Sequence, residues 1–276
     1  MLIYGTASFS EKSWVGSFYP EGTQPRDFLE HYAAQFHAVE ADTTYYGVPR
    51  ESMVKGWAER TPDGFRVCAK FPRSIVHAGE GRQPDPGAIL SDWNETDEFL
   101  EVMRLLGDKC GPLVLQFPYF ARDLISRGDF LERLDVYLDK LPKDFRYGVE
   151  LRTRGFICDP LLHILRRHDV SFVASELPYM PHPADLAKKF DLVTTDFFYG
   201  RLIGDRKAVD AETKTFDRIV IDQSASLDRW AEMLEGVRGR VKDVYVFANN
   251  HFAGHGPATI RELIDRLDGP PGRGEE

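Results

Sequence analysis

Two carboxylates stand two residues apart in the stretch Ala38–Pro49, AVEADTTYYGVP, which otherwise has the character of a strand. Residues two apart on a strand point to the same face, so Glu40 and Asp42 are predicted to lie side by side. Two acids on a buried face are costly unless a partner pairs with them or a reaction uses them. The pair therefore directs attention to the side chains that converge on it.

Cations and a further acid follow other strand-like segments. Glu150 and Arg152 end one such segment, and Lys70 and Arg201 end two others. Two carboxylates in different surroundings can have their pKa values driven apart, which makes Glu40 and Glu150 an acid–base pair with Lys70 as a third catalytic candidate. Arginines suit bidentate contact with phosphate or carboxylate, so the set also predicts an anionic small-molecule ligand. The structural alternative is that Lys70 or Arg152 closes an ion pair with one of these acids.

Amide, imidazole and aromatic side chains complete the predicted site. Two consecutive amides, Asn249 and Asn250, are suited to orienting hydroxyl groups, and Trp14 either packs in the core or stacks on a sugar or base. The predicted substrate-binding residues are Asp42, His77, Gln116, Arg152, Arg201, Asn249, Asn250, His251, Trp14 and Tyr46.

A divalent metal is the competing chemistry for these residues. Oxygen and imidazole ligands sufficient for one or two ions come from Glu40, Asp42, Glu150, Glu176, His77, His251 and His255. No compact signature such as His-Glu-x-x-His appears, and the segment NNHFAGHG that carries two of the histidines is expected to be a loop. We therefore predict no resident cofactor, with a divalent metal as the alternative.

Short β-rich segments alternate with longer segments of helical period along the chain. These predicted strands and helices must position the site residues. The predicted strands are Leu2–Ser8, Ala38–Tyr46, Arg66–Phe71, Leu113–Phe117, Tyr147–Arg152, Ser171–Ser175, Leu192–Leu202 and Val244–Asn249. The predicted helices are Arg26–Phe36, Arg50–Arg60, Trp93–Leu106, Arg127–Leu141, Pro160–His168, Leu227–Val237 and Pro257–Leu267, with a short one over Pro183–Phe190. Eight βα units in about 250 residues predict an α/β protein folded as a single (β/α)8 TIM barrel.

Domain limits and loop lengths follow from the same pattern. Residues 1–268 are predicted to form one domain, and Gly269–Glu276, GPPGRGEE, a flexible tail. Long insertions follow strand three, Ala78–Ser91, and strand seven, Gly204–Ser226. In a barrel both lie on the catalytic face, where long loops serve as lids or binding loops.

Composition excludes several classes of partner. Lys and Arg number 35 against 44 Asp and Glu, a net charge of −9, which argues against broad binding to nucleic acid or an anionic membrane surface and leaves a local basic pocket open. No apolar run approaches the length of a bilayer span, and the apolar part of the amino terminus is too short for a signal peptide, so a cytoplasmic protein is expected. Three scattered cysteines fit neither a disulfide framework nor a Cys-x-x-Cys metal site.

Several ordered blocks of the sequence resemble the YecE-like family, known as domain of unknown function 72. The blocks are Trp14–Pro20, Val39-Glu40 with Thr44–Tyr46 and Pro49, Ala69-Lys70 with His77, Gly111–Leu113 with Gln116–Pro118, Val149–Arg152, Tyr199 with Arg201 and Gly204, and Tyr245–Asn250. The resemblance covers nearly the whole chain. It implies a TIM-barrel fold and supports the site residues named above, without implying a reaction. Asp42 departs from the family pattern, which usually has Asn there, and Thr153 stands where a His is common.

Three functions remain open on these observations. The leading hypothesis is an enzyme acting on a small anionic, hydroxyl-rich molecule, such as a phosphorylated sugar or a nucleotide fragment. The second is a divalent-metal-dependent phosphoesterase or nuclease in the same barrel. The third is a non-catalytic protein that holds a ligand for a partner.

Overall fold

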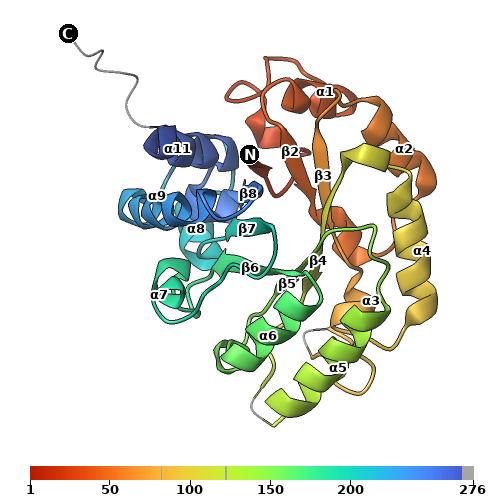
Figure 1. Cartoon of the computed structure of the whole chain (residues 1–276). Helices are drawn as coiled ribbons and strands as arrows, with labels where there is room; N and C mark the ends of the chain where they lie inside the picture. The colour runs from red at the N-terminus through yellow and green to blue at the C-terminus, as the bar shows by residue number, and fades with distance from the viewer. Residues whose placement is uncertain (82, 122, 269–276) are drawn as a thin grey trace.

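The computed structural model describes residues 1–81, 83–121 and 123–268, and the predicted tail 269–276 lies outside them. Within these residues eight parallel strands form one sheet in the order β1-β8-β7-β6-β5-β4-β3-β2. The two end strands, β1 and β2, lie against each other, so the sheet curls into a nearly closed barrel surrounded by helices (Figure 1). The predicted (β/α)8 barrel is confirmed.

All eight predicted strands are present, with adjusted ends. Their bounds are β1 Leu2–Thr6, β2 Ala38–Ala41, β3 Arg66–Lys70, β4 Cys110–Gln116, β5 Tyr147–Glu150, β6 Ser171–Glu176, β7 Phe197–Leu202 and β8 Asp243–Ala248. The largest differences are that β2 ends five residues before Tyr46 and β7 begins five residues after Leu192. The order along the sheet is that of consecutive right-handed βα units.

Helices cover the outside of the barrel and connect the strands. Those that match the main predicted helices are α1 Phe28–Ala33, α2 Glu51–Glu59, α4 Trp93–Arg104, α5 Arg127–Lys140, α6 Asp159–Arg167, α9 Ser224–Arg238 and α11 Gly256–Asp268. Short helices that the sequence pattern did not predict are α3 Arg73–Val76, α8 Arg206–Glu212 and α10 Asn250–Ala253, whereas α7 Pro183–Ala187 falls within the predicted short helix. NNHFAGHG, expected to be a loop, thus begins with a helical turn. Several ends carry their own caps: the side chain of Ser126 accepts from the Asp129 N–H at the start of α5.

A single side chain joins the first and second strands. The hydroxyl of buried Tyr32 accepts from the backbone N–H of Thr6 at 2.7 Å and donates to the carbonyl of Ala38 at 2.9 Å. A Cβ atom on Gly5 would collide with that carbonyl, so only glycine allows the two strands to approach this closely. The seam between β1 and β2 is therefore closed by Tyr32.

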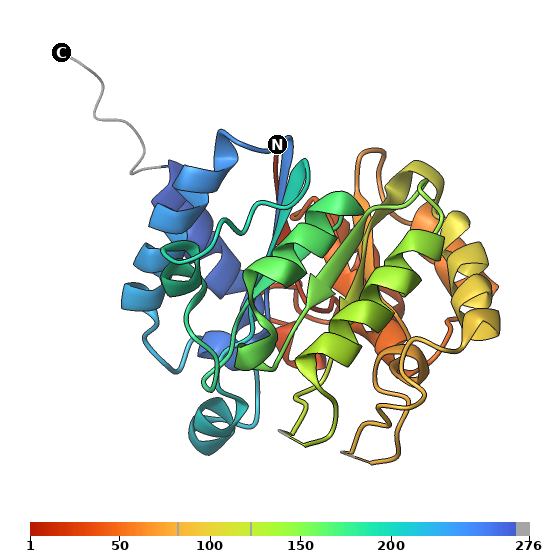
Figure 2. The ribbon, with the colours of Figure 1, turned by 60° about the horizontal axis from the view of Figure 1, so that its bottom comes forward.

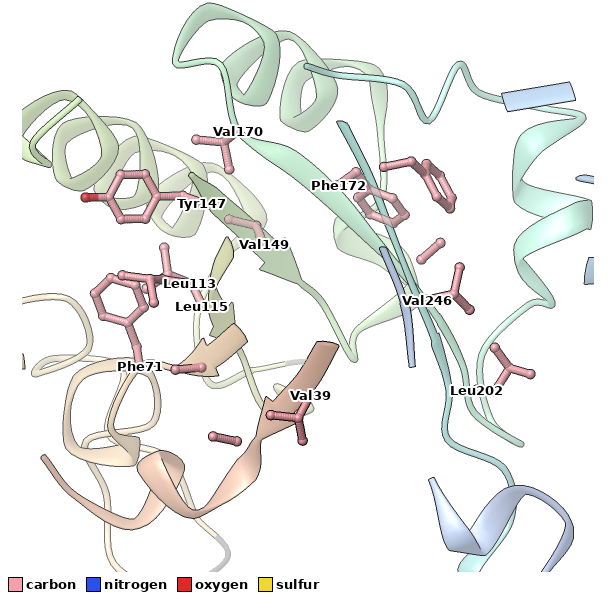
Figure 3. Close-up of a cluster of buried hydrophobic side chains, with 14 of the residues drawn as sticks. Val39, Phe71, Leu113, Leu115, Tyr147, Val149, Val170, Phe172, Leu202 and Val246 are labelled. Atoms are coloured by element: carbon pink, nitrogen blue, oxygen red, sulfur yellow. The ribbon is translucent and has the colours of Figure 1, made fainter. Parts of the chain in front are cut away.

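The outward faces of the strands form the main hydrophobic core with the helices. Residues such as Val39, Leu115 and Val149 alternate with inward residues along their strands and point toward the surrounding helices (Figure 3). Aromatic side chains fill the wider spaces, including stacked Tyr19 and Phe28 with ring centroids 4.5 Å apart. This shell fixes the direction of every strand and therefore of the side chains inside the barrel.

The inward faces divide into two layers. We call the lower layer the apolar cluster of Ile3, Ala38, Cys68, Val114, Val173, Phe197, Tyr199, Tyr245 and Phe247. We call the upper layer the polar residues that follow at the carboxyl ends of the strands, namely Glu40, Lys70, Gln116, Glu150, Ser175 and Arg201. On five strands an upper-layer residue comes two positions after a lower-layer one, so the strand period of two places them on the same face.

Both long insertions lie at the carboxyl end of the barrel, opposite the amino terminus (Figure 2). The insertion after β3 folds back on α3, since the backbone N–H of Leu90 donates to the carbonyl of Ile75 at 2.8 Å. The insertion after β7 contains α8 and is anchored by Phe216, whose backbone N–H donates to Ser13 Oγ at 3.0 Å. This second insertion therefore covers the ends of β1 and β8.

Candidate functional site

Arg201 is the centre of a buried charge network in the upper layer. The side chain, in a residue only 3% exposed, extends from β7 into the barrel. One guanidinium nitrogen, Nη1, donates to Gln116 Oε1 at 2.9 Å and to Glu150, and the other, Nη2, donates to Glu40 Oε1 at 2.6 Å. Arg201 thus joins residues from β2, β4 and β5 across the interior.

Glu40 is fully buried and has three partners. Besides Arg201, Lys70 Nζ lies 3.1 Å from Glu40 Oε1, and the hydroxyl of Tyr199 donates to Oε2 at 2.8 Å. Tyr199 belongs to the lower layer, so its hydroxyl links the two layers. Burial raises the pKa of this tyrosine well above its usual value, which keeps the hydroxyl protonated as a donor.

Glu150 is held by two arginines. Arg152 Nε donates to Glu150 Oε1 at 2.7 Å, while Arg201 contacts the other oxygen. Arg152 is half-buried at the mouth, whereas Glu150 is fully buried. Counting these ion pairs, three cations face two carboxylates, so the network carries an excess of one positive charge before Asp42 is considered.

The environment separates the pKa values of these groups. Burial alone would raise the pKa of both glutamates, but Arg201 and its neighbouring cations outweigh burial, so the pKa of Glu40 is lowered and that of Glu150 falls to about 2. Burial lowers the pKa of Lys70 in spite of Glu40 and raises that of Asp42 in spite of Lys70. Glu40 and Glu150 are therefore ionised at neutral pH, and Lys70 and Asp42 are displaced toward their neutral forms.

Asp42 does not share a strand face with Glu40, contrary to the sequence prediction. It begins a 3-10 helix, Asp42–Tyr46, because β2 ends at Ala41. The hydroxyl of Thr44 accepts from the backbone N–H of Lys70 at 2.9 Å and lies 2.8 Å from the carbonyl of the same residue. This side chain takes the place of a further β2 residue beside β3, so the backbone turns and carries Asp42 toward β8.

A polar pocket of roughly 220 Å³ lies beside the network, where β1, β2 and β8 end. Asp42 is the link, because its carboxyl group interacts electrostatically with Lys70, Glu40 and Arg201 and also lines the pocket. Hydroxyl and amide groups dominate the walls, and the insertion after β7 contributes an aromatic ring. The lining residues are Thr6, Ala7, Ser8, Ser10, Glu11, Trp14, Asp42, Phe216, Ala248, Asn249, Asn250 and His251.

The two asparagines of this pocket have their side-chain oxygens engaged within the protein. Asn249 caps α10 by accepting from the His251 backbone N–H at 2.9 Å. Asn250 accepts from Trp14 Nε1 at 3.2 Å and from the Gly256 backbone N–H at 2.9 Å. Trp14 is buried among Phe18, Tyr19 and other aromatics, as its core interpretation predicts, and it also lines the pocket, where stacking on a ligand stays a prediction.

Two other predicted binding residues differ in burial, since His77 is buried and Tyr46 is exposed. The ring of His77 is within hydrogen-bonding distance of Arg73 Nη2, 3.0 Å from Nδ1, and accepts from the Gly79 N–H at the start of the insertion after β3. Tyr46 is 84% exposed and makes an edge contact with Tyr45.

The candidate metal ligands are dispersed. Glu176 points outward and accepts from Trp230 Nε1 at 2.6 Å and from the Ser226 hydroxyl. These two hydrogen bonds join β6 to α9. His255 packs edge-on against Trp14, and burial lowers its pKa to about 4. His251 faces Asp210 of α8 at 3.5 Å. Within residues 1–81, 83–121 and 123–268, no three His, Cys, Asp or Glu side chains are grouped so as to hold a metal ion.

Three residues of the site were missed in the sequence. Tyr199 and Thr44 both fall within predicted strands, and their roles depend on partners far away in the chain, Glu40 and Lys70. Ser175 is the last residue of another predicted strand. The alternation of inward positions on β6 was the signal that could have placed Ser175 at the level of the charged residues.

Fold and site together define a (β/α)8-barrel protein whose mouth holds a buried charge network beside a polar pocket. The chain belongs to the family described as "Protein of unknown function DUF72", whose model matches residues 3–273. Relatives with curated sequences agree. The UPF0759 protein YecE of Escherichia coli strain K12 is 34% identical over 158 residues, which are 56% of this chain and 50% of YecE, so the match spans half the length of that relative.

Other relatives cover more of the chain. The UPF0759 protein YunF of Bacillus subtilis strain 168 is 20% identical over 91% of this chain and 90% of its own. The crystal structure of a DUF72 family protein from Thermotoga maritima superposes with a TM-score of 0.71 at 27% identity, covering 96% of this chain and 97% of that one. D-psicose 3-epimerase, crystallised in the presence of D-fructose, shares the fold alone, with a TM-score of 0.55 at 8% identity over 96% of this chain and 95% of its own.

None of the helices in the described part of this chain has the length and apolar character that a bilayer crossing requires.

Proposed function

We propose that this protein is an enzyme acting on a small anionic, hydroxyl-rich molecule, such as a phosphorylated sugar or a nucleotide fragment, at the carboxyl end of the barrel. The observation that carries the proposal is the buried network of Glu40, Lys70, Arg201 and Glu150. With Arg152 included, the network has three cations against two glutamates, and it borders a polar pocket large enough for a single sugar-sized ligand.

Energetics favour a functional explanation of the network. Taking several charges out of water costs free energy that their mutual attraction does not reliably recover, and apolar replacements of buried ion pairs are often as stable or more stable. The lower layer, one pleat away on the same strands, shows that this barrel fills its interior with apolar side chains. A charged upper layer is therefore expected to serve a ligand, and perturbed pKa values in such a place support the same conclusion.

The pKa shifts assign different roles to the acids and the lysine. A carboxylate with a pKa of about 2, as in Glu150, is a weak proton acceptor at neutral pH, so Glu40 and Glu150 are proposed to position Arg201, Arg152 and Lys70. An amine with a lowered pKa exchanges protons more readily, so Lys70 is the proposed acid–base group. Asp42, with its raised pKa, is proposed to contact the ligand and to support this exchange from the pocket side.

A ligand screen followed by product analysis tests the proposal. Sugar phosphates, sugar acids and nucleoside monophosphates would be screened for thermal stabilisation of the full chain, and each stabilising compound would be incubated and analysed by NMR for a product. We expect turnover by the wild type. Lys70→Met, which keeps the length of the side chain and removes the amine, is expected to retain stabilisation by the same compound and to lose at least 100-fold in kcat.

Lys55→Met is the matched control, since Lys55 lies on the surface of α2 and pairs with Glu51. This variant is expected to turn over the substrate at the wild-type rate. A compound that stabilises the wild type without ever giving a product would show a binding protein instead of an enzyme. Full activity in Lys70→Met would remove the lysine from the chemistry.

A further inference from the structure

Two polar atoms of the upper layer are buried without a hydrogen-bond partner among the described residues. They are Nε of Arg201 and Oγ of Ser175. A buried donor without a partner costs about 1–3 kcal/mol, so such groups need an explanation. Arg201 uses both of its terminal nitrogens on Glu40, Glu150 and Gln116, which leaves Nε as the one donor that the network does not satisfy.

The two atoms belong to neighbouring side chains. In the ladder between β6 and β7, Ser175 is the register partner of Arg201, and Val173 pairs with Tyr199 one step below. Val173 and Tyr199 both belong to the lower layer, so Ser175 and Arg201 face the interior above them. Directly paired inward residues on adjacent strands lie side by side, and the two unsatisfied groups therefore meet at the β6–β7 side of the mouth.

The chemistry of the two groups specifies what can satisfy them. Arg201 Nε is a donor and never an acceptor, and a serine hydroxyl donates as readily as it accepts. One acceptor atom placed between them would satisfy both. Arg152, at the end of the adjacent strand β5, brings the network to three cations against two glutamates, which favours an anionic oxygen over a neutral one.

We propose that Ser175 and Nε of Arg201 form the subsite for the anionic oxygen of the substrate, as a phosphoryl or carboxylate group. This inference rests on the proposed function and adds an orientation to it. The anionic end of the substrate lies at the β6–β7 side, and its hydroxyl groups extend across the mouth toward Asp42 and the pocket at the ends of β8 and β1. Lys70 interacts with Glu40 and Asp42, which assigns it to the pocket end of the ligand.

Binding of inorganic phosphate and sulfate to the full chain tests the subsite without any knowledge of the reaction. Isothermal titration calorimetry at pH 7.5 and low salt would be run on the wild type, Ser175→Ala and Ser171→Ala. Ser171 is the matched control because it begins the same strand, is equally small and donates, within the described part of the chain, to the carbonyl groups of Phe172 and Phe197. We expect Ser175→Ala to weaken phosphate binding about 10-fold and Ser171→Ala to leave it unchanged.

A second variant protects the test against a folding defect. Ser175→Cys retains a small side chain with a weak donor and is expected to bind phosphate with an affinity between those of the wild type and Ser175→Ala. The fold of each variant would be checked by circular dichroism and thermal unfolding. Equal affinities in the wild type, Ser175→Ala and Ser175→Cys would overturn the subsite, as would a wild type that binds neither anion.

The orientation has its own measurement. Asp42→Asn is expected to weaken binding of D-ribose 5-phosphate without weakening that of inorganic phosphate, because the two ends of the ligand contact different residues. A loss of affinity for both would contradict the proposed orientation. Failure of the enzyme proposal is distinguishable, since it would appear as phosphate binding that depends on Ser175 in a protein without turnover.

Discussion

The lower and upper layers of the barrel interior come from the same strands, one pleat apart, and have opposite chemistry. Cys68 is followed by Lys70 on β3, and Val114 by Gln116 on β4. Both layers are buried, with the exception of half-buried Ser175, so exposure does not explain the difference. The comparison teaches that the lower layer closes the barrel by apolar packing, whereas the upper layer holds charges at a desolvation cost that the proposed ligand-binding role would explain.

Tyr199 marks the boundary between the layers. Its ring stacks with Tyr245 at 6.1 Å in the lower layer, and its hydroxyl donates to Glu40 in the upper layer. Variants on either side of this boundary are expected to separate stability from binding.

Removing the central cation of the upper layer should have the largest effect. Arg201→Met leaves Glu40 and Glu150 buried with fewer partners, and we expect a loss of about 3–5 kcal/mol in the free energy of unfolding. Urea denaturation at pH 7 followed by circular dichroism measures this. The triple variant with Glu40→Gln and Glu150→Gln should recover most of that stability, because no unpaired acid remains. A loss below about 1 kcal/mol in Arg201→Met would show that the network is not strongly coupled.

Lowering the pH should remove the stability contributed by the upper layer while leaving that of the apolar lower layer unchanged. The folded-state pKa of Glu150, about 2, is below its ordinary value of 4.5, so its contribution to stability is complete above about pH 4.5 and is lost as the pH falls toward 2. The expected loss is on the order of 3 kcal/mol. Unfolding measured in urea at pH 7, 4.5, 3 and 2 should show the wild type and Glu150→Gln converging over this window. Parallel curves would contradict the assigned ionisation of Glu150.

A truncation in the lower layer should reduce stability and spare binding. Val114→Ala removes two methyl groups from the apolar cluster, with an expected loss of about 2 kcal/mol. Phosphate affinity, measured by calorimetry as for Ser175, should remain within twofold of the wild type. Weakened anion binding in this variant would mean that the two layers are mechanically coupled.

An exposed aromatic at the rim gives the smallest expected effect on stability. Tyr46 is 84% exposed, so Tyr46→Ala should change the free energy of unfolding by no more than about 0.5 kcal/mol. Because this tyrosine follows β2 at the mouth, the informative measurement is the affinity for a stabilising ligand from the screen. Unchanged affinity would place Tyr46 outside the binding site.

Much of the barrel could be predicted from local patterns, because strand and helix periods are properties of short segments. The inward positions of Glu40, Lys70, Gln116 and Glu150 follow from the same period of two. Asp42 could not be placed, since β2 ends where the side chain of Thr44 pairs with β3. The engagement of the Asn250 oxygen by Trp14 was equally hidden, because the partners are 236 residues apart.

The hydroxyl of Tyr32 connects β1 to β2, because it hydrogen-bonds to the backbone of both Thr6 and Ala38. The polar pocket lies beside this connection, since Thr6 at the end of β1 and Asp42 after β2 both line it. A ligand in the pocket would contact residues at the ends of both β1 and β2. Ligand binding should therefore reduce local opening between these two strands. Slower amide hydrogen exchange at Thr6 on ligand binding would be the sign of this coupling.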